Sequence, residues 1–247
     1  MSTDGPRLSV TDQAIESIKA MIVGGELGPG DRLPKEADLA ARLGLSRNSL
    51  REAVRALSLI GLLEVRQGDG TYVSSLSPDD LLATTSFLAD VQQPRTVLHV
   101  LEVRRVIEAA ATALAAQYVT DEELAALEGM LERMRQATTV EGLVEQDRAF
   151  HRAIANASRN PVLASLVESF SGTTSRARIW RGMRQADALE QTFSEHAAIL
   201  DALRHRRPDL ARAWATAHVA GVEAWLEAAG SDVDLSRAPD GAQPPSA

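Results

Sequence analysis

The sequence contains no cysteine. Disulfide bonds, thiolate nucleophiles and zinc sites with cysteine ligands are therefore excluded. Long apolar runs are also missing, since no stretch approaches the roughly 20 residues that a membrane-spanning helix requires. The first residues, MSTDGPRLSV, lack the basic and then apolar pattern of a signal peptide. We expect a cytoplasmic protein without a membrane partner.

The sequence also lacks an excess of positive charge. The net charge is −8 and the isoelectric point is about 5.2, which does not favour nucleic acid as a partner of the whole surface. The first 75 residues nevertheless hold nine basic and ten acidic side chains, while the rest hold 17 and 24. Any nucleic-acid surface must therefore be a local patch. The length of 247 residues and the hydrophobic content of 45% predict two globular domains.

Residues 8–75 carry the pattern of three short helices and a hairpin. Apolar residues spaced as on one helix face predict helices over 11–23 and 35–43, and Gly44 suits the end of the second. Ser46 is a suitable N-cap for a third helix, which ends near Ile60. The runs LLEV and TYV flank RQGDG and predict a hairpin. This order is typical of a winged helix-turn-helix DNA-binding domain.

The third helix has a basic face opposite its apolar one. Arg47, Arg51 and Arg55 recur every four residues. Arginine stripes often only solvate a helix, but this one coincides with a tight turn, a polar helix start and a glycine-rich wing. We predict DNA contacts of two kinds. Base edges would be met by Arg47, Asn48 and Ser49, and phosphates or the minor groove by Lys35, Arg66, Gln67 and Gly68, with Arg51 placed for either.

The segment LGPGDRLPKEADLAARLGLSRNSLREAVRALSLIGLLEVRQGDGTYV resembles the winged-helix domain of GntR-type bacterial transcription regulators. The resemblance covers residues 15–73 and implies binding to double-stranded DNA. One position departs from the family pattern. The family commonly has an arginine in a P-S-E-R-x-L-A segment, and the matching PKEADLA has Ala37 in its place. A usual DNA contact is therefore missing, and the operator sequence stays open.

The segment SSLSPDD marks a boundary, and only helical patterns follow it. We predict an all-helical antiparallel bundle of six to seven helices over 78–229, so that the fold class is mostly α. Residues 230–247 are polar and predict a disordered tail. The expected helices cover 78–90, 95–117, 121–136, 140–158, 161–180, 187–206 and 208–229.

Histidine is scarce, and three of the five histidines have a telling spacing. His196 precedes the expected helix corner at Arg207 by the same number of residues as His218 follows it, so both would lie about 16 Å from the corner in antiparallel helices. Asp147 and His151 lie one turn apart on a third helix. The alternatives without a metal are that Asp147 and His151 form a solvent-exposed hydrogen-bonded pair, and that the histidines are ordinary core residues. If all four converge, they suit a divalent ion, zinc first, with nickel or manganese as alternatives.

The rear segments LEVRRVIEAAATALAA, DRAFHRAIANASRNP and SEHAAILDALRHRRPDLARAWATAH are similar to the FCD ligand-binding domain of the FadR subgroup, over residues 80–228. In metal-binding members these segments supply an aspartate and three histidines, which match Asp147, His151, His196 and His218. His99 and His205 match no ligand position. The resemblance implies a cavity where the metal accepts a small organic acid. Arg104, in the family's E-x-R segment, would be a second anchor, with Arg105, Arg176 and Arg178 as further candidates.

The functional hypothesis is a homodimeric regulator of a near-palindromic operator, with DNA affinity modulated by a metal-bound carboxylate effector. Two alternatives stay open. The metal is itself the signal or a structural element, or the protein is a metal-dependent hydrolase. Against the hydrolase, all four matching groups are used as ligands and neither HExxH nor GxSxG occurs. We therefore expect no enzymatic activity.

Overall fold

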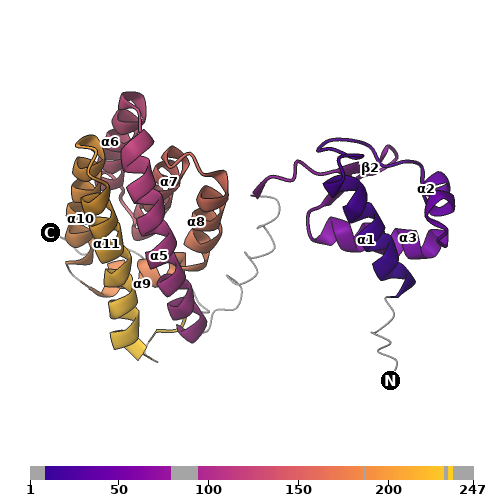
Figure 1. The fold of residues 1–247 in the computed structure, drawn as a ribbon. Helices are drawn as coiled ribbons and strands as arrows, with labels where there is room; N and C mark the ends of the chain where they lie inside the picture. Colours follow the sequence, from indigo (N-terminus) through magenta and orange to yellow (C-terminus); the bar gives the residue numbers. More distant parts are fainter. Residues whose placement is uncertain (1–8, 79–93, 186, 231–232, 236–247) are drawn as a thin grey trace, which may run out of the picture. The chain divides into compact units, whose positions relative to one another are not determined.

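The computed structural model describes residues 9–78, 94–185, 187–230 and 233–235. The chain forms two compact units, Met1–Thr84 and Thr85–Ala247 (Figure 1). Apart from its first residue, the helix that we predicted over 78–90 lies outside the described residues. In the described part, no helix is both long enough and apolar enough to span a membrane.

The helices of the first unit are α1 (Val10–Val23), α2 (Glu36–Leu43) and α3 (Arg47–Leu59). The Ser46 side chain accepts a hydrogen bond from the backbone N–H of Ser49, as an N-cap does. Gly44 is left-handed, with φ of 67°, a conformation that costs glycine no steric strain. This residue lets α3 follow α2 after a very short turn, as the sequence predicts.

A small sheet forms the wing. Strands β1 (Leu63–Arg66) and β2 (Gly70–Val73) are antiparallel, and Leu63 pairs with Val73. The segment before α2 lies along β2, because the N–H of Leu33 donates to the carbonyl of Thr71 at 2.8 Å. The unit is closed by a core of apolar side chains from all these elements. Its members include Ile18, Leu39, Leu50, Leu57, Leu63 and Val73. The predicted winged helix-turn-helix is confirmed.

The second unit is helical throughout its described part, which confirms the mostly α fold class. Figure 1 shows α5, α10 and α11 running alongside one another. The largest hydrophobic cluster lies between the helices and includes Leu127, Met134, Phe150, Ile154, Ile199 and Leu203. The helices are α5 (Pro94–Tyr118), α6 (Asp121–Arg135), α7 (Val140–Ala157), α8 (Pro161–Thr173), α9 (Ser175–Arg184), α10 (Ala188–Arg204) and α11 (Pro208–Ala229).

The prediction of one helix over 161–180 is wrong, because the chain turns at Thr174 between α8 and α9. Gly172, Thr173 and Thr174 all have low helix propensity. The hydroxyl of Thr174, which is completely buried, also accepts a hydrogen bond from Arg104 of α5. The turn gives α9 a direction of its own and so decides where its arginines point.

The predicted tail also needs a correction. Val233 and Leu235 are only 2% exposed and pack in a hydrophobic cluster with residues of α5 and α11. These two residues therefore belong to the folded domain, because their apolar side chains are removed from water there. Residues 231, 232 and 236–247 lie outside the described part of the chain.

Candidate metal centre and DNA-binding surface

Four side chains from three helices converge inside the second unit. Helix α7 supplies Asp147 and His151 one turn apart, α10 supplies His196, and α11 supplies His218. All four are at most 3% exposed, and each offers a ligand atom within 4.8 Å of the ligand atoms of the others. These are the four residues that the sequence predicts as metal ligands. His99 and His205, which matched no ligand position, are exposed and outside this cluster.

The distances between the ligand atoms suit a first-row divalent ion. Nε2 of His151 lies 3.1 Å from Nε2 of His218 and 3.2 Å from Nε2 of His196. Oδ1 of Asp147 lies 3.2 to 3.7 Å from the three ring nitrogens. Bonds of about 2.0–2.2 Å to one ion give ligand separations of about 3.4 Å in tetrahedral geometry and about 3.0 Å in octahedral geometry. The observed separations fall around both values.

Carboxylates behind the rings orient two of the histidines. Nδ1 of His218 is hydrogen-bonded to Oε2 of Glu195 at 2.9 Å, and Nδ1 of His151 lies 3.2 Å from Oε2 of Glu108. A carboxylate only accepts hydrogen bonds, so a neutral ring with its proton on the Nδ1 that faces the carboxylate presents the lone pair of Nε2 to the centre. Two such lone pairs 3.1 Å apart repel each other. A cation between them removes this repulsion, and the donor set therefore fits a bound metal ion.

Neighbouring positive charges keep the buried carboxylates of Asp147 and Glu108 ionised. Burial alone would raise the pKa of Asp147, but the charge of the Arg178 guanidinium and the neighbouring rings of His151 and His196 outweigh it and hold the pKa well below its usual value. For Glu108, burial is likewise outweighed, chiefly by Arg104, and the pKa is lowered. Burial lowers the pKa of His196, which favours the neutral ring that a metal ligand requires.

Glu195 has a lowered pKa as well. Burial would raise its pKa, but the hydrogen bond that Glu195 accepts from His218 is the largest of the contributions that outweigh burial. Gln191 adds to this by donating to Oε1 of Glu195 at 2.8 Å. The carboxylate is therefore a fixed negative charge directly behind one of the ligand histidines.

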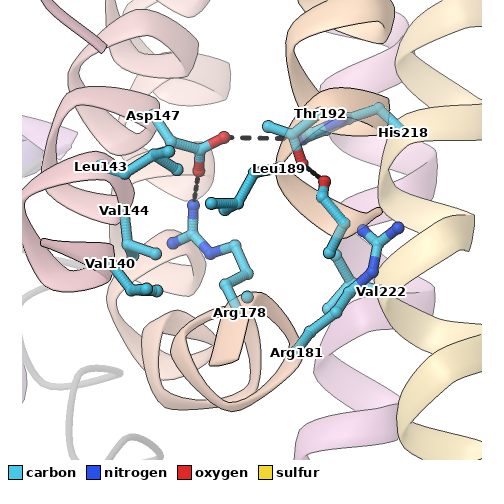
Figure 2. Close-up of a pocket in the computed structure, with 12 residues that line it drawn as sticks. Val140, Leu143, Val144, Asp147, Arg178, Arg181, Leu189, Thr192, His218 and Val222 are labelled. Atoms are coloured by element: carbon cyan, nitrogen blue, oxygen red, sulfur yellow. Dashed lines mark hydrogen bonds and ion pairs between the residues drawn. The ribbon is translucent and has the colours of Figure 1, made fainter. Parts of the chain in front are cut away.

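A small cavity lies beside Asp147 and His218 (Figure 2). Its volume is about 30 Å³, room for about two or three water molecules. Figure 2 shows Arg178 and Arg181 rising from α9, with Arg178 directed at Asp147. The rest of the lining is mostly apolar, and Gly182 lets α9 approach α7, because a Cβ there would lie 2.8 Å from Val140. The open side of the ligand cluster thus faces a compact, positively charged space.

Arg104, the predicted effector anchor, is 1% exposed and does not line this cavity. Its Nε donates to Glu108 at 2.6 Å and its Nη1 donates to Thr174. In this structure Arg104 therefore acts behind the site, by holding the carboxylate next to His151. Glu108, Glu195 and Arg181 were not identified from the sequence as part of the site. The role of each depends on contacts with other helices, which the sequence pattern does not show.

Replacing Glu195 with glutamine should weaken divalent-metal binding about tenfold to a hundredfold, as is usual for a carboxylate behind a ligand histidine. The substitution keeps the shape but removes the charge that holds the proton on Nδ1 of His218. Competition with a chromophoric chelator measures the affinity. Glu190→Gln, an exposed position on the same helix, is the matched control. Equal affinities of the two variants would contradict the assigned role of Glu195.

The predicted DNA-binding residues lie on the surface of the first unit. Arg47 and Asn48 are exposed in the first turn of α3, Ser49 is half-buried there, and Arg51 is exposed in the next turn. Lys35 is exposed at the start of α2. In the wing, Arg66 is exposed at the end of β1, and Gln67 and Gly68 are exposed in the turn before β2. Ala37 is also exposed in α2, so the position that lacks the family arginine faces outward.

Two contacts that were not predicted connect the elements of this surface. Oε1 of Glu36 lies 2.7 Å from Nε of Arg51 and restrains that side chain. Arg32 binds the backbone carbonyl of Asp69 and thereby ties the wing to the segment before α2. A groove of about 460 Å³ runs between α2, α3 and the wing, and Lys35 and Arg51 both line it. DNA contact by these residues remains a prediction.

Comparisons with known proteins agree with this architecture. The family described as "Bacterial regulatory proteins, gntR family" matches residues 10–73, and the FCD domain matches residues 99–221. The chain is 33% identical to the HTH-type transcriptional regulator LutR of Bacillus subtilis (strain 168), over 82% of this chain and 94% of that protein. It is 32% identical to the galactonate operon transcriptional repressor of Escherichia coli (strain K12), over 83% and 91%.

Among solved structures, Streptococcus agalactiae GntR is similar with a TM-score of 0.59 and 28% identity, over 87% of this chain and 99% of that one. The fold and these matches define a bacterial DNA-binding regulator of the winged-helix class. The chain belongs to the GntR family of transcription regulators and carries an FCD domain.

Proposed function

We propose that this protein is a regulator whose operator affinity is changed by a small organic acid bound at a divalent metal ion. Asp147, His151, His196 and His218 would hold the ion. The observation that carries the proposal is the convergence of these four ligand atoms beside a cavity with buried arginines. The names of the relatives LutR and the galactonate repressor describe transcription regulators, which agrees with this reading.

The chemistry of the cavity supports an acid as the ligand. When bound, the metal supplies a positive charge and open coordination positions for oxygen ligands. Arg178 keeps Oδ2 of Asp147 occupied, so that Oδ1 points to the metal position. The buried guanidinium groups lower the cost of removing an anion from water. Arg104 supports the same site through Glu108, and a direct contact with the acid stays a prediction.

The DNA-binding step follows from the winged helix. A homodimer would place two α3 helices in major grooves about one helical turn apart and would read a near-palindromic operator. The acid can change operator affinity only if it binds the DNA-competent and incompetent states unequally, typically by about 1–3 kcal/mol. Because bacterial DNA lies in the cytoplasm, this function places the protein there.

A thermal-shift experiment tests the metal-anchored sensor. Small organic acids are titrated into metal-loaded protein and into chelator-treated protein, and the melting temperature is recorded. We expect a rise that needs both the metal and an acid, because only the loaded site completes the anion pocket. The same acid should change the affinity for an operator selected from random duplexes, measured by fluorescence anisotropy at fixed salt.

The alternatives give other outcomes. A rise with metal alone, and no response to any acid, would favour a metal that is itself the signal or a structural element. A change of operator affinity on metal addition would then separate the signal from the structural role. Turnover of small esters or amides by the metal-loaded protein would favour the hydrolase.

A further inference from the structure

The second unit encloses a balanced set of buried charges. Among the described residues of this unit, six charged side chains other than histidine are buried. They are the arginines Arg104, Arg178 and Arg181 and the carboxylates Glu108, Asp147 and Glu195. With neutral histidines these charges cancel. A divalent cation would add two positive charges that no further buried carboxylate in the described part of this unit neutralises, and an uncompensated buried charge is costly.

One of the three arginines has no carboxylate partner of its own. Arg104 is paired with Glu108, and Arg178 is paired with Asp147. Arg181 reaches only amide oxygens, because Nε donates to Gln185 at 3.0 Å and Nη2 donates to Gln191 at 2.8 Å. No carboxylate of the described chain lies within ion-pair distance of its guanidinium.

Glu195, the carboxylate joined to Arg181 through Gln191, already uses both oxygens in hydrogen bonds. Gln191, which accepts a hydrogen bond from Arg181, donates one through its Nε2 to Oε1 of Glu195 at 2.8 Å. The other oxygen of Glu195 accepts from Nδ1 of His218. A relay of hydrogen bonds therefore joins Arg181 to a metal-ligand histidine, while the positive charge of Arg181, 3% exposed, remains without a direct counter-ion.

Arg181 lines the same cavity as Asp147 and His218 (Figure 2). With a metal ion bound, the cavity would therefore be next to two positive charges. One is the ion at the four ligands, and the other is the guanidinium of Arg181 on α9. One carboxylate group can occupy the open positions of the ion. A second anionic group is then required against Arg181 for the buried charges to balance.

We propose that the effector is a short dicarboxylate, with one carboxylate at the metal and the other against Arg181. This proposal rests on the proposed function and names the ligand class for the same site. The cavity of about 30 Å³ favours a short carbon chain between the two acid groups. A monocarboxylate of equal size leaves one buried positive charge unbalanced and binds more weakly.

Calorimetry on the full-length, zinc-loaded protein tests the proposal. Malonate, succinate and glutarate are each compared with the half-amide in which one carboxylate is a neutral carboxamide of nearly the same size. The best dicarboxylate should bind about tenfold to a hundredfold more tightly than its half-amide, as expected for a charged hydrogen-bonded partner. Because dicarboxylates chelate metals, the zinc content of the protein is measured after each titration.

Three variants connect the preference to the residue. Arg181→Gln should bind zinc but lose the preference for the dicarboxylate, and Arg181→Lys, which keeps the charge, should retain it. Arg184→Gln makes the same change at an exposed position of α9 and should behave as the original protein. If the Gln variant does not fold, the comparison of each dicarboxylate with its half-amide on the original protein still tests the proposal.

The outcomes are distinguishable. Half-amides that bind as tightly as dicarboxylates, or a preference that survives Arg181→Gln, would overturn the dicarboxylate and leave the metal-anchored sensor standing. If both ligand series fail to bind the zinc-loaded protein, and no small organic acid raises its melting temperature in the thermal-shift experiment, the sensor itself is contradicted.

Discussion

Replacing His151 with glutamine should weaken divalent-metal binding about 150-fold. His151 has ligand-atom contacts with all three other members of the cluster. A structural zinc site contributes roughly 10–16 kcal/mol of apparent binding free energy, so one ligand of four accounts for about 3 kcal/mol. Competition with a chelator of known affinity measures the loss.

The same variant should lose most of its stabilisation by metal. At a free metal concentration about 1,000 times its dissociation constant, the original protein gains about 4 kcal/mol. For a domain of this size, that gain raises the melting temperature by roughly 8–16 °C. The His151→Gln protein should gain only about 1 kcal/mol at the same concentration.

The control for this substitution is His205→Gln. His205 is exposed at the end of α10 and contacts Asp201 rather than the cluster. It should bind metal as the original protein does. If both variants bind metal equally well, the four side chains are not the ligands, and the sensor proposal loses its foundation.

Replacing Arg47 and Arg51 together with alanine should weaken binding to a selected operator about 30-fold to 10⁴-fold. Each bidentate contact between an arginine and a guanine contributes roughly 1–3 kcal/mol of discrimination, and the two positions lie on the exposed face of α3. Anisotropy titrations on the operator and on a scrambled duplex, at two salt concentrations, separate specific from non-specific binding.

Arg42→Ala is the matched control for charge in the same unit. Arg42 is exposed near the end of α2 and is paired with Glu26, which lies after α1 and not on α3. Its loss should leave operator discrimination almost unchanged. A double variant that still distinguishes operator from scrambled DNA as the original protein does would show that α3 is not the reading element.

Helical spacing made the ligand cluster predictable. Asp147 and His151 are four apart, which places them on one face of a helix. His196 and His218 are equally far from the corner between α10 and α11, and the short turn forces the two helices to run antiparallel, so both rings lie at one depth. The DNA-binding unit was predictable for a similar reason, because turn residues and periodicity act over short distances.

The surroundings of the cluster were not predictable in this way. Glu195 is next to His196 in the sequence, but neighbouring side chains on a helix point about 100° apart. Glu195 therefore meets His218 on another helix, and that meeting depends on how α10 is rotated. The wrong prediction of one continuous helix over 161–180 had a larger effect on the predicted site. A continuous helix ending at Trp180 does not include Arg181, whereas the turn at Thr174 brings both Arg178 and Arg181 to the cavity.

Sequence alone determined the two-domain order, the winged helix and the identity of four ligand-type residues, since these depend on local spacing and on which side chains are present. Tertiary structure decided which carboxylates stand behind the rings and which arginine lacks a counter-ion. The physical reason is that burial and charge pairing depend on the rotation and packing of separate helices, which no local pattern in the chain records.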